Sequence, residues 1–376
     1  MKISTKISAL ILAGGIAFSN ASFAQDEISD LVKSSPADAT ALTRAYLEPF
    51  FKGTGLGLNS GWAHTGTTKK LLRFDVKVGA TLAMPPASAK TFDVTKIGLS
   101  NNFRPTGSNV VTPTIAGAEE NGVEMGYYTT QNGKEYQITK FNLPQGLNVP
   151  MPGVQVQANV GLIKGIEAMI RFSPDIEPNK DFGKISMKGG GIKFQPFRLI
   201  PGGKKIAKLI PVDIAMAIGY NSIKYSYDKI DVQPEAGATP KPGTSPTAKF
   251  DDQKFEVEFS GLSVEAIASK KLLMFTPFVS VGYVTSNTKA GLYGDYPVTT
   301  GGIITPTPTP SNPNAYTVQK QYEIIKNPVN IDERFVSGLR AGAGLGINLF
   351  IFHLYASYNL APYKYLNAGV SVGFGK

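Results

Sequence analysis

Apolar residues occupy every second position over several long stretches of the chain. The clearest stretch lies at the C-terminal end and contains Leu366, Ala368, Val370, Val372 and Phe374. The same period of two recurs within residues 74–82, 154–162, 212–221 and 335–347. A period of two indicates β-strands, and a tilted strand crosses a membrane in about nine to eleven residues. The pattern therefore predicts long strands with one apolar face.

The second face of these strands separates a membrane barrel from a soluble β-sandwich. It carries Gly, Ser, Asn and Gln with isolated charges, where a strand facing water usually carries Lys, Glu and Thr. Small and polar residues suit a crowded or hydrated lumen. The sequence therefore predicts an all-β fold, an antiparallel transmembrane β-barrel.

Connection lengths predict the topology of this barrel. In outer-membrane barrels the periplasmic turns are short and the outer loops are long. Counting strands back from the C-terminus places the proline-bearing segments 231–249 and 289–332 outside, where their composition predicts little regular structure. The same count places 64–70 outside and 85–90 inside, and it closes with twelve strands.

A barrel of fourteen strands is the alternative. Val123, Met125 and Tyr127 alternate ahead of Asn132-Gly133, a dipeptide typical of hairpin turns. This stretch predicts either two further wall strands or a hairpin within an outer loop.

The N-terminal residues are typical of an export signal. Lys2 and Lys6 flank the start of an apolar stretch, and Ser22 and Ala24 provide the small residues of a cleavage site ahead of Gln25. We therefore expect a signal peptide over 1–24, a plug or periplasmic segment over 25–52, and a barrel over 53–376 in the outer membrane of a Gram-negative bacterium.

The segment after the signal predicts a short helix. Ser35 is a candidate N-cap, Pro36 suits the first helical position, and Pro49 is the expected end. We expect this helix to contact the lumen as a plug; a position beneath the barrel is the alternative.

Composition narrows the chemistry. The chain has no cysteine and two histidines, which excludes disulfides and thiolate sites and argues against a metal cofactor or any other cofactor. Its net charge of +10 is spread around turns, which argues against nucleic acid and fits contact with the outer-membrane lipids, phospholipid and lipopolysaccharide. The basic connection 197–210 predicts either an amphipathic segment on the inner leaflet or a solvated turn.

Six charged residues fall on the inward face by strand parity. They are Asp75, Lys77, Glu167, Arg171, Asp213 and Arg340. Charges on the lipid face are costly, so this placement is expected under any function. They either hold the plug through ion pairs or line a path for a solute.

An enzyme is the least favoured interpretation. His353, Ser357 and Asn359 share one face of a predicted strand, but they are spaced along it and no residue is marked as a nucleophile. A lipid hydrolase is therefore only a third alternative.

Several stretches resemble an uncharacterised family of Gram-negative outer-membrane proteins. The matching blocks, within residues 45–220, include YLEPFFKGTGLGLNSGW, KLLRFDVKVGATLA and LPQGLNVPMPGVQVQANVGLIKGIEAMIRFSP. The resemblance implies a barrel with an N-terminal plug-like region and no assigned activity. The layout is also similar to that of fatty-acid-channel barrels, at the level of architecture alone.

These observations predict a passive channel for small, hydrophobic molecules without catalysis. The alternative is a structural or adhesive surface barrel that acts through its outer loops.

The cleavage site gives the first testable prediction. Signal peptidase should cut after Ala24, so the mature protein should begin at Gln25. Intact-mass spectrometry of protein purified from outer membranes checks this, and retention of residues 1–24 would contradict it.

Overall fold

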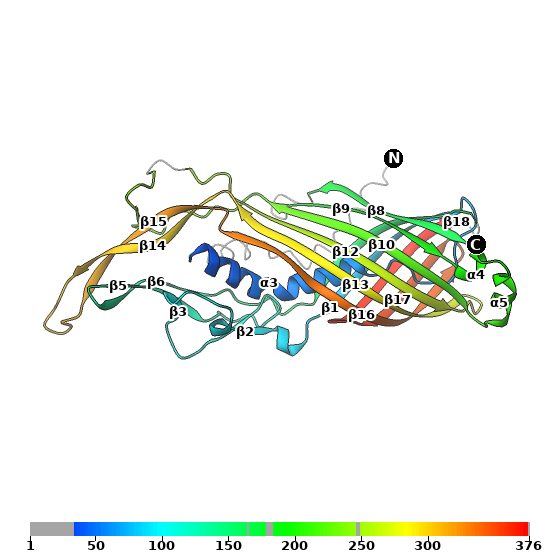
Figure 1. Cartoon of the computed structure of the whole chain (residues 1–376), viewed down its shortest axis with the longest axis horizontal. Coiled ribbons are helices and arrows are strands. Elements are labelled where there is room, and N and C mark those ends of the chain that lie inside the picture. Colours follow the sequence, from blue (N-terminus) through cyan, green and yellow to red (C-terminus); the bar gives the residue numbers. More distant parts are fainter. Residues whose placement is uncertain (1–33, 164, 178–182, 246–248, 375–376) are drawn as a thin grey trace.

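Ten antiparallel strands form a closed barrel in the computed structural model, which describes residues 34–163, 165–177, 183–245 and 249–374 (Figure 1). The wall strands are β1 (Phe74–Met84), β7 (Met151–Gly161), β8 (Ile166–Ile176), β9 (Lys184–Phe194), β10 (Asp213–Tyr227), β12 (Lys254–Ser269), β13 (Phe275–Tyr293), β16 (Val329–Leu349), β17 (Phe352–Leu360) and β18 (Lys364–Phe374). The predicted signal peptide, with Ala24 and Gln25, lies outside the described residues.

The barrel closes where the first wall strand meets the last. β1 pairs with β18 from Phe74↔Phe374 to Met84↔Lys364, and on its other edge with β7. The antiparallel barrel is confirmed. The described residues give it ten wall strands, however, so the prediction of twelve to fourteen was wrong.

Two stretches account for the difference. Residues 53–59 are helical, and residues 91–100 contain only the short β2 (Thr91–Asp93) and the 3-10 turn η3 (Val94–Lys96). β2 cannot extend into a wall strand because the side chain of Asp93 accepts a hydrogen bond from the Thr95 N–H and starts that turn.

Because these two stretches are not wall strands, two connections lie at the opposite ends of the barrel from those predicted. Residues 64–70 lie among the short turns, where the Gly66 N–H donates to Ser269 Oγ over 2.8 Å. Residues 85–90 lie at the opposite end, which carries the long connections. Because long connections face outward in such barrels, we refer to the outer end and the periplasmic end.

Three small sheets lie beyond the wall at the outer end (Figure 1). β2 pairs with β4 (Val111–Pro113). The others are β3–β5–β6 (Phe103–Pro105, Glu124–Gln131, Lys134–Asn142) and β11–β15–β14 (Thr239–Pro240, Tyr316–Lys326, Asp295–Pro306). β5 and β6 are a hairpin outside the wall, so the outer-loop alternative for this segment is confirmed.

The long outer segment 289–332 is folded rather than irregular. β14 and β15 pair with each other and continue the neighbouring strands β13 and β16, which are 19 and 21 residues long. Tyr296 and Val298 are fully buried there in the main apolar core. The prediction from composition failed because these few apolar residues have a core to pack against.

Among the described residues one long helix, α3 (Pro36–Asn59), runs from between the outer sheets into the barrel (Figure 1). It starts as predicted, because Ser35 Oγ accepts a hydrogen bond from the Asp38 N–H. It passes Pro49 and ends ten residues later than expected, at Asn59. Inside a barrel the backbone polar groups need internal partners, so the helix continues despite the bond lost at Pro49.

The outer part of α3 packs among apolar and charged side chains of the strands. Phe51 and Phe335 have ring centroids 4.9 Å apart. Arg44 makes a bidentate ion pair with Glu333, at 2.6 and 2.7 Å. No helix in the described part of the chain is long and apolar enough to span a bilayer.

An apolar belt surrounds the outside of the wall. Its exposed members alternate with buried polar residues, as in Val372 beside the fully buried Ser371. Exposed residues of the belt include Phe74, Leu82, Ile170, Phe172, Ile218, Val279, Val281, Leu339, Leu345 and Leu366. This face is the one that meets lipid.

The belt predicts the cost of a charge at membrane depth. Val281, 61% exposed on β13, should lose about 2–4 kcal/mol of unfolding free energy when changed to Arg. Thr305→Arg, on the exposed outer part of β14, is the matched control and should change little. Denaturant unfolding in lipid vesicles measures both, and equal costs would contradict the assigned membrane position.

Candidate functional site: a closed lumen with a split wall

The C-terminal end of α3 lies inside the barrel and is held there by Arg171 of β8. The guanidinium, 1% exposed, donates to Leu58 O and to Ser60 O, both at 2.7 Å. It also donates to Gln157 Oε1 at 2.9 Å. The last carbonyls of a helix lack intrahelical partners and carry partial negative charge, so a buried cation is favourable at this position.

Lys77 of β1 supports the chain just after the helix. Its ammonium, also buried, donates to the carbonyls of Gly61 and Trp62. On the other side, Gln155 Nε2 donates to Gly57 O at 2.5 Å. We call α3 together with residues 60–70 the plug.

Trp62 fills the lumen below the helix. The Arg171 guanidinium carbon lies 3.8 Å from the centre of its ring, in a cation–π contact. The indole also lies against Gly219 of β10, where an added Cβ would be 2.3 Å from the ring. Only glycine leaves room for this ring against β10.

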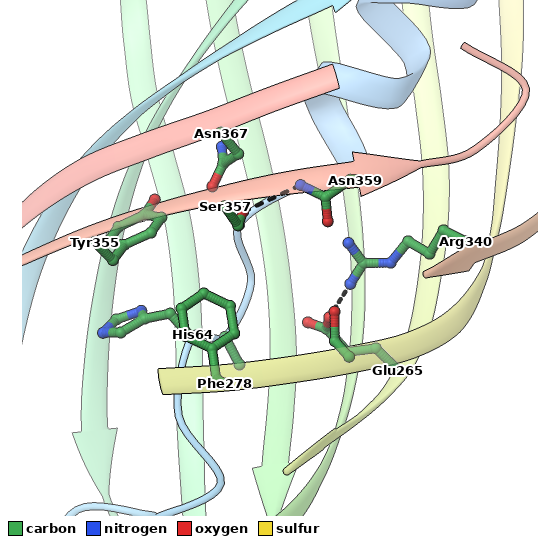
Figure 2. A pocket seen from close by; sticks show the side chains of 11 residues that line it. His64, Glu265, Phe278, Arg340, Tyr355, Ser357, Asn359 and Asn367 are labelled. Atoms are coloured by element: carbon green, nitrogen blue, oxygen red, sulfur yellow. Dashed lines mark hydrogen bonds and ion pairs between the residues drawn. The ribbon is translucent and has the colours of Figure 1, made fainter. Parts of the chain in front are cut away.

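A buried ion pair joins two other wall strands, β16 and β12 (Figure 2). Arg340 is ion-paired with Glu265, and it donates to Tyr365 Oη at 3.0 Å. Both members of the pair are buried beside a small cavity that His64 and Tyr355 also line.

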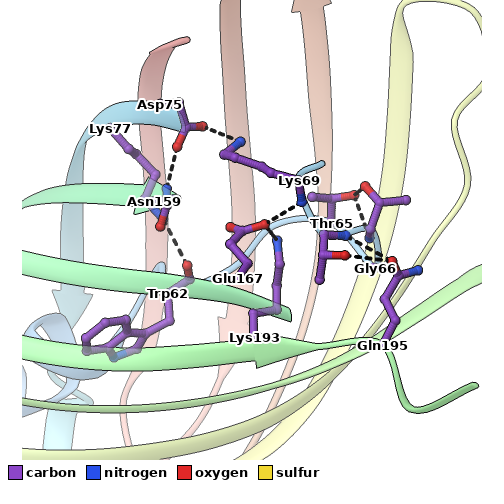
Figure 3. A network of polar contacts seen from close by, with 12 residues as sticks. Trp62, Thr65, Gly66, Lys69, Asp75, Lys77, Asn159, Glu167, Lys193 and Gln195 are labelled. Carbon is purple, nitrogen blue, oxygen red and sulfur yellow. Dashed lines mark hydrogen bonds and ion pairs between the residues drawn. The ribbon is translucent and has the colours of Figure 1, made fainter. Parts of the chain in front are cut away.

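A larger cavity of about 350 Å³ lies at the periplasmic end of the lumen. We call it the vestibule. Trp62 and most of residues 63–70 line it. Figure 3 shows Trp62, Thr65 and Lys69 of this segment beside charged residues of the wall. Its lining contains two ion pairs, Lys69–Asp75 at 2.9 Å and Lys193–Glu167 at 3.1 Å.

The six predicted residues all lie on the inner side and divide into three groups. Asp75, Glu167 and Asp213 line the vestibule, Lys77 and Arg171 bind the plug, and Arg340 belongs to the pair with Glu265. Whether any of them contacts a solute stays a prediction.

Sequence reasoning missed Trp62, Gly219 and Gln155. Trp62 is the only tryptophan of the chain, which was a signal, but it lay in a segment expected to be a strand. Gln155 lies on the polar face of the predicted strand at 154–162, but parity cannot tell which residue of that face meets the helix.

The ladder between β7 and β8 is interrupted. The strands pair over five rungs that end at Gln157↔Arg171, and they pair no further within the described residues. Above that rung, β7 residues 151–156 stay paired with β1, and the rest of β8 pairs with β9. We call the unpaired edges, 151–156 and 172–176, the seam.

Two prolines explain the seam. Continuing the register would place Pro174 opposite Val154 and Pro152 opposite Ile176. Proline cannot donate to a ladder and is rare within a sheet. Because β7 residues 151–156 pair with the outer half of β1, the seam lies in the outer half of the wall.

Nearly the whole sequence matches one family model. The Family of unknown function (DUF6588) matches residues 1–374. The chain belongs to this family. No relative was found among curated proteins.

Solved structures similar to this DUF6588 chain are outer-membrane proteins. The Pseudomonas putida toluene transporter TodX is 9% identical over 88% of this chain and 97% of its own, with a TM-score of 0.27. The Escherichia coli outer membrane protease OmpT is 10% identical over 81% and 94%, with a TM-score of 0.28. The Yersinia pestis attachment invasion locus protein Ail is 8% identical over 81% and 99%, with a TM-score of 0.25. Likenesses this distant carry no argument about activity.

The residues of the hydrolase alternative are not brought together in this DUF6588 protein. Asn359 Nδ2 donates to Ser357 Oγ at 3.1 Å, and both line the small cavity, whereas His353 lines the vestibule. Among the described residues, no group of three or more metal-ligating side chains is found.

The contact between Trp62 and β10 gives a test of the closed lumen. Gly219→Ala should cost about 1–3 kcal/mol of unfolding free energy, because the added methyl overlaps the indole. Gly338→Ala, where the nearest atom is 3.5 Å away, should cost much less.

A double-mutant cycle identifies the cause of this cost. In a Trp62→Ala background, Gly219→Ala should no longer destabilise, because the overlapping ring is gone. An unchanged cost in that background would show that the methyl clashes with something other than Trp62.

Proposed function

We propose that this DUF6588 protein is a gated outer-membrane channel for small hydrophobic molecules. The observation that carries the proposal is the seam, an opening in backbone pairing at membrane depth. Unpaired strand edges are costly in lipid because no water satisfies their polar groups. We therefore infer that the position where two strand edges stay unpaired serves the passage of a solute.

The proposed route joins the seam to the vestibule. The last paired rung below the seam is Gln157↔Arg171, and Arg171 is the residue that binds the end of α3. Trp62 packs against the Arg171 guanidinium and lines the vestibule. Arg171 and Trp62 therefore lie between the seam and the vestibule in the proposed route. A solute passes when these two side chains move.

The surroundings of the seam favour an apolar solute with a polar end. Phe172 and Ile170 are exposed on its lipid side. Gln155, Thr81 and Ser60 are buried behind it and form a hydrogen-bonded group. A molecule entering from lipid would meet apolar side chains first and amide and hydroxyl groups next.

The inner end of α3 is suited to act as the gate. The helix contains Pro49, followed by Gly53, Gly55 and Gly57. Within a helix, each glycine or proline costs about 1 kcal/mol or more relative to alanine. This part of the helix is therefore stabilised mainly by its packing and by Arg171. When those contacts loosen, the last turn has little intrinsic tendency to remain helical.

Bridging the seam tests the route. In the variant Val154→Cys/Pro174→Cys, a short bifunctional maleimide should join β7 to β8 and reduce uptake of a small aromatic hydrocarbon into proteoliposomes to the protein-free level. The untreated variant should retain uptake. The native chain has no cysteine, so the reagent acts only at these positions.

The control bridge lies on a rung that is already paired. Ala158→Cys/Ile170→Cys joins the same two strands below the seam and should leave uptake unchanged. Equal uptake with and without the bridge at 154 and 174 would rule out the seam as the route. Absence of uptake by the unmodified protein would reject the channel itself.

A surface platform is the second candidate. The observation in its favour is the ordered outer extension, in which β13 and β16 continue far beyond the length of a membrane crossing. Three small sheets and the outer half of α3 share its core. Binding of the intact protein to a surface, without solute uptake, would support this function instead.

A further inference from the structure

Bulky apolar residues occupy the tips of three connections at the periplasmic end. Leu72 precedes β1, Leu273 lies between β12 and β13, and Phe350 lies between β16 and β17. Their side chains are 74%, 93% and 98% exposed. Such tips are ordinarily polar, because nothing else on the protein covers them.

The backbone at these tips makes the choice of residue more unusual. Leu72, Leu273 and Phe350 have φ values of 59°, 53° and 53°, in the left-handed region. Glycine and asparagine adopt this conformation readily, whereas a bulky residue there is rare and strained. The turn itself therefore does not require these side chains, and their apolar character needs another explanation.

Two of the tips repeat one sequence. Residues 69–74 read KKLLRF and residues 270–275 read KKLLMF. Leu72 and Leu273 occupy the same place in the two copies, each two residues ahead of the first phenylalanine of a strand. The repeat joins lysines, an exposed apolar tip and the start of the lipid-facing belt.

The charged residues of the periplasmic connections are all basic. The connections 69–73, 162–165, 195–212, 270–274 and 350–351 contain no Asp or Glu. Their exposed basic residues are Lys70, Arg73, Arg198, Lys205, Lys270 and Lys271. The acidic residues nearby point inward, as Glu167 does in its pair with Lys193.

The connection between β9 and β10 contributes to the same surface. It contains the short helices α4 (Pro196–Leu199) and α5 (Gly203–Leu209), at the periplasmic end of the barrel (Figure 1). Leu199, Ile200, Ile206 and Leu209 are exposed there. This pattern extends the apolar and basic surface around the periplasmic end.

We propose that these connections form a collar that inserts its apolar tips into the inner leaflet and gathers anionic phospholipid around the periplasmic end. Exposed leucine and phenylalanine side chains suit the boundary between acyl chains and headgroups, and neighbouring lysines attract lipid phosphates. The collar is the tips Leu72, Leu273 and Phe350, the α4–α5 connection, and the basic residues beside them.

Continuity with the belt favours lipid over a periplasmic protein as the occupant. Leu273 is followed by exposed Met274 and Phe275, and Phe350 is followed two residues later by exposed Phe352. The apolar surface therefore continues from the wall to these two tips, whereas at Leu72 the exposed Arg73 lies between the tip and Phe74. Because the lipid-facing strands begin next to these tips, the tips lie at the depth of the lipid headgroups.

A single-cysteine label measures the depth of a tip. Leu273→Cys in the full mature chain would carry a nitrobenzoxadiazole probe in vesicles of phosphatidylcholine and phosphatidylglycerol. Its emission should be blue-shifted and quenched by brominated lipid, as at the belt control Val281→Cys. A probe on the outer control Asn312→Cys, in an exposed loop, should show neither the blue shift nor the quenching.

Brominating one lipid at a time tests the preference for anionic lipid. Phosphatidylglycerol should quench the label at 273 more than phosphatidylcholine at equal mole fraction, and Lys270→Glu/Lys271→Glu should remove that difference. Equal quenching by both lipids in the protein that keeps Lys270 and Lys271 would overturn the anionic preference. A label at 273 with a water-like, unquenched spectrum would overturn insertion and leave the tips for a protein partner.

Discussion

Hydrogen bonding of the backbone inside the membrane is the constraint on which this structure depends. α3 ends within the lumen, where its last carbonyls cannot reach bulk water. Arg171 and Gln155 bind the carbonyls of Leu58 and Gly57, and Lys77 binds those of Gly61 and Trp62 just after the helix. Each of these three side chains comes from a different wall strand. The position of the plug, the burial of two cations and the closure of the lumen all follow from this requirement.

The same constraint makes the seam informative. Every other neighbouring pair of wall strands in the described residues is joined by a longer ladder than β7 and β8. The ladder stops at the rung that also holds the plug, so the weakest part of the wall and the end of the helix share Arg171. A change that releases the helix would therefore act directly beside the split wall.

Much of the barrel could be predicted from the sequence, because a period of two is a direct signature of a strand with two different faces. Parity also placed all six charged candidates on the inner side, and Ser35 was correctly identified as the start of the helix.

The errors came from residues whose local signals were overruled by their surroundings. Pro49 ends an isolated helix, but within a barrel the following glycine-rich residues stay helical because they need internal hydrogen bonds and fit closely against β7. The outer proline-rich segment formed strands because its few apolar residues reach a core built by distant parts of the chain. The division of the charged residues between plug and vestibule, and the contact of Trp62 with Gly219, depend on packing that strand parity does not describe.

The central claim is that the plug must move for a solute to pass, and a staple between the plug and the wall tests it most directly. Gly57 of α3 and Gly153 of β7 lie in backbone contact, since a Cβ on Gly57 would be 3.4 Å from the Gly153 Cα. A disulfide in Gly57→Cys/Gly153→Cys would join α3 to β7 and hold the helix in place. The account predicts that hydrocarbon uptake into proteoliposomes is lost when this disulfide forms and returns on reduction. Uptake that is equal in the oxidised and reduced protein would contradict it.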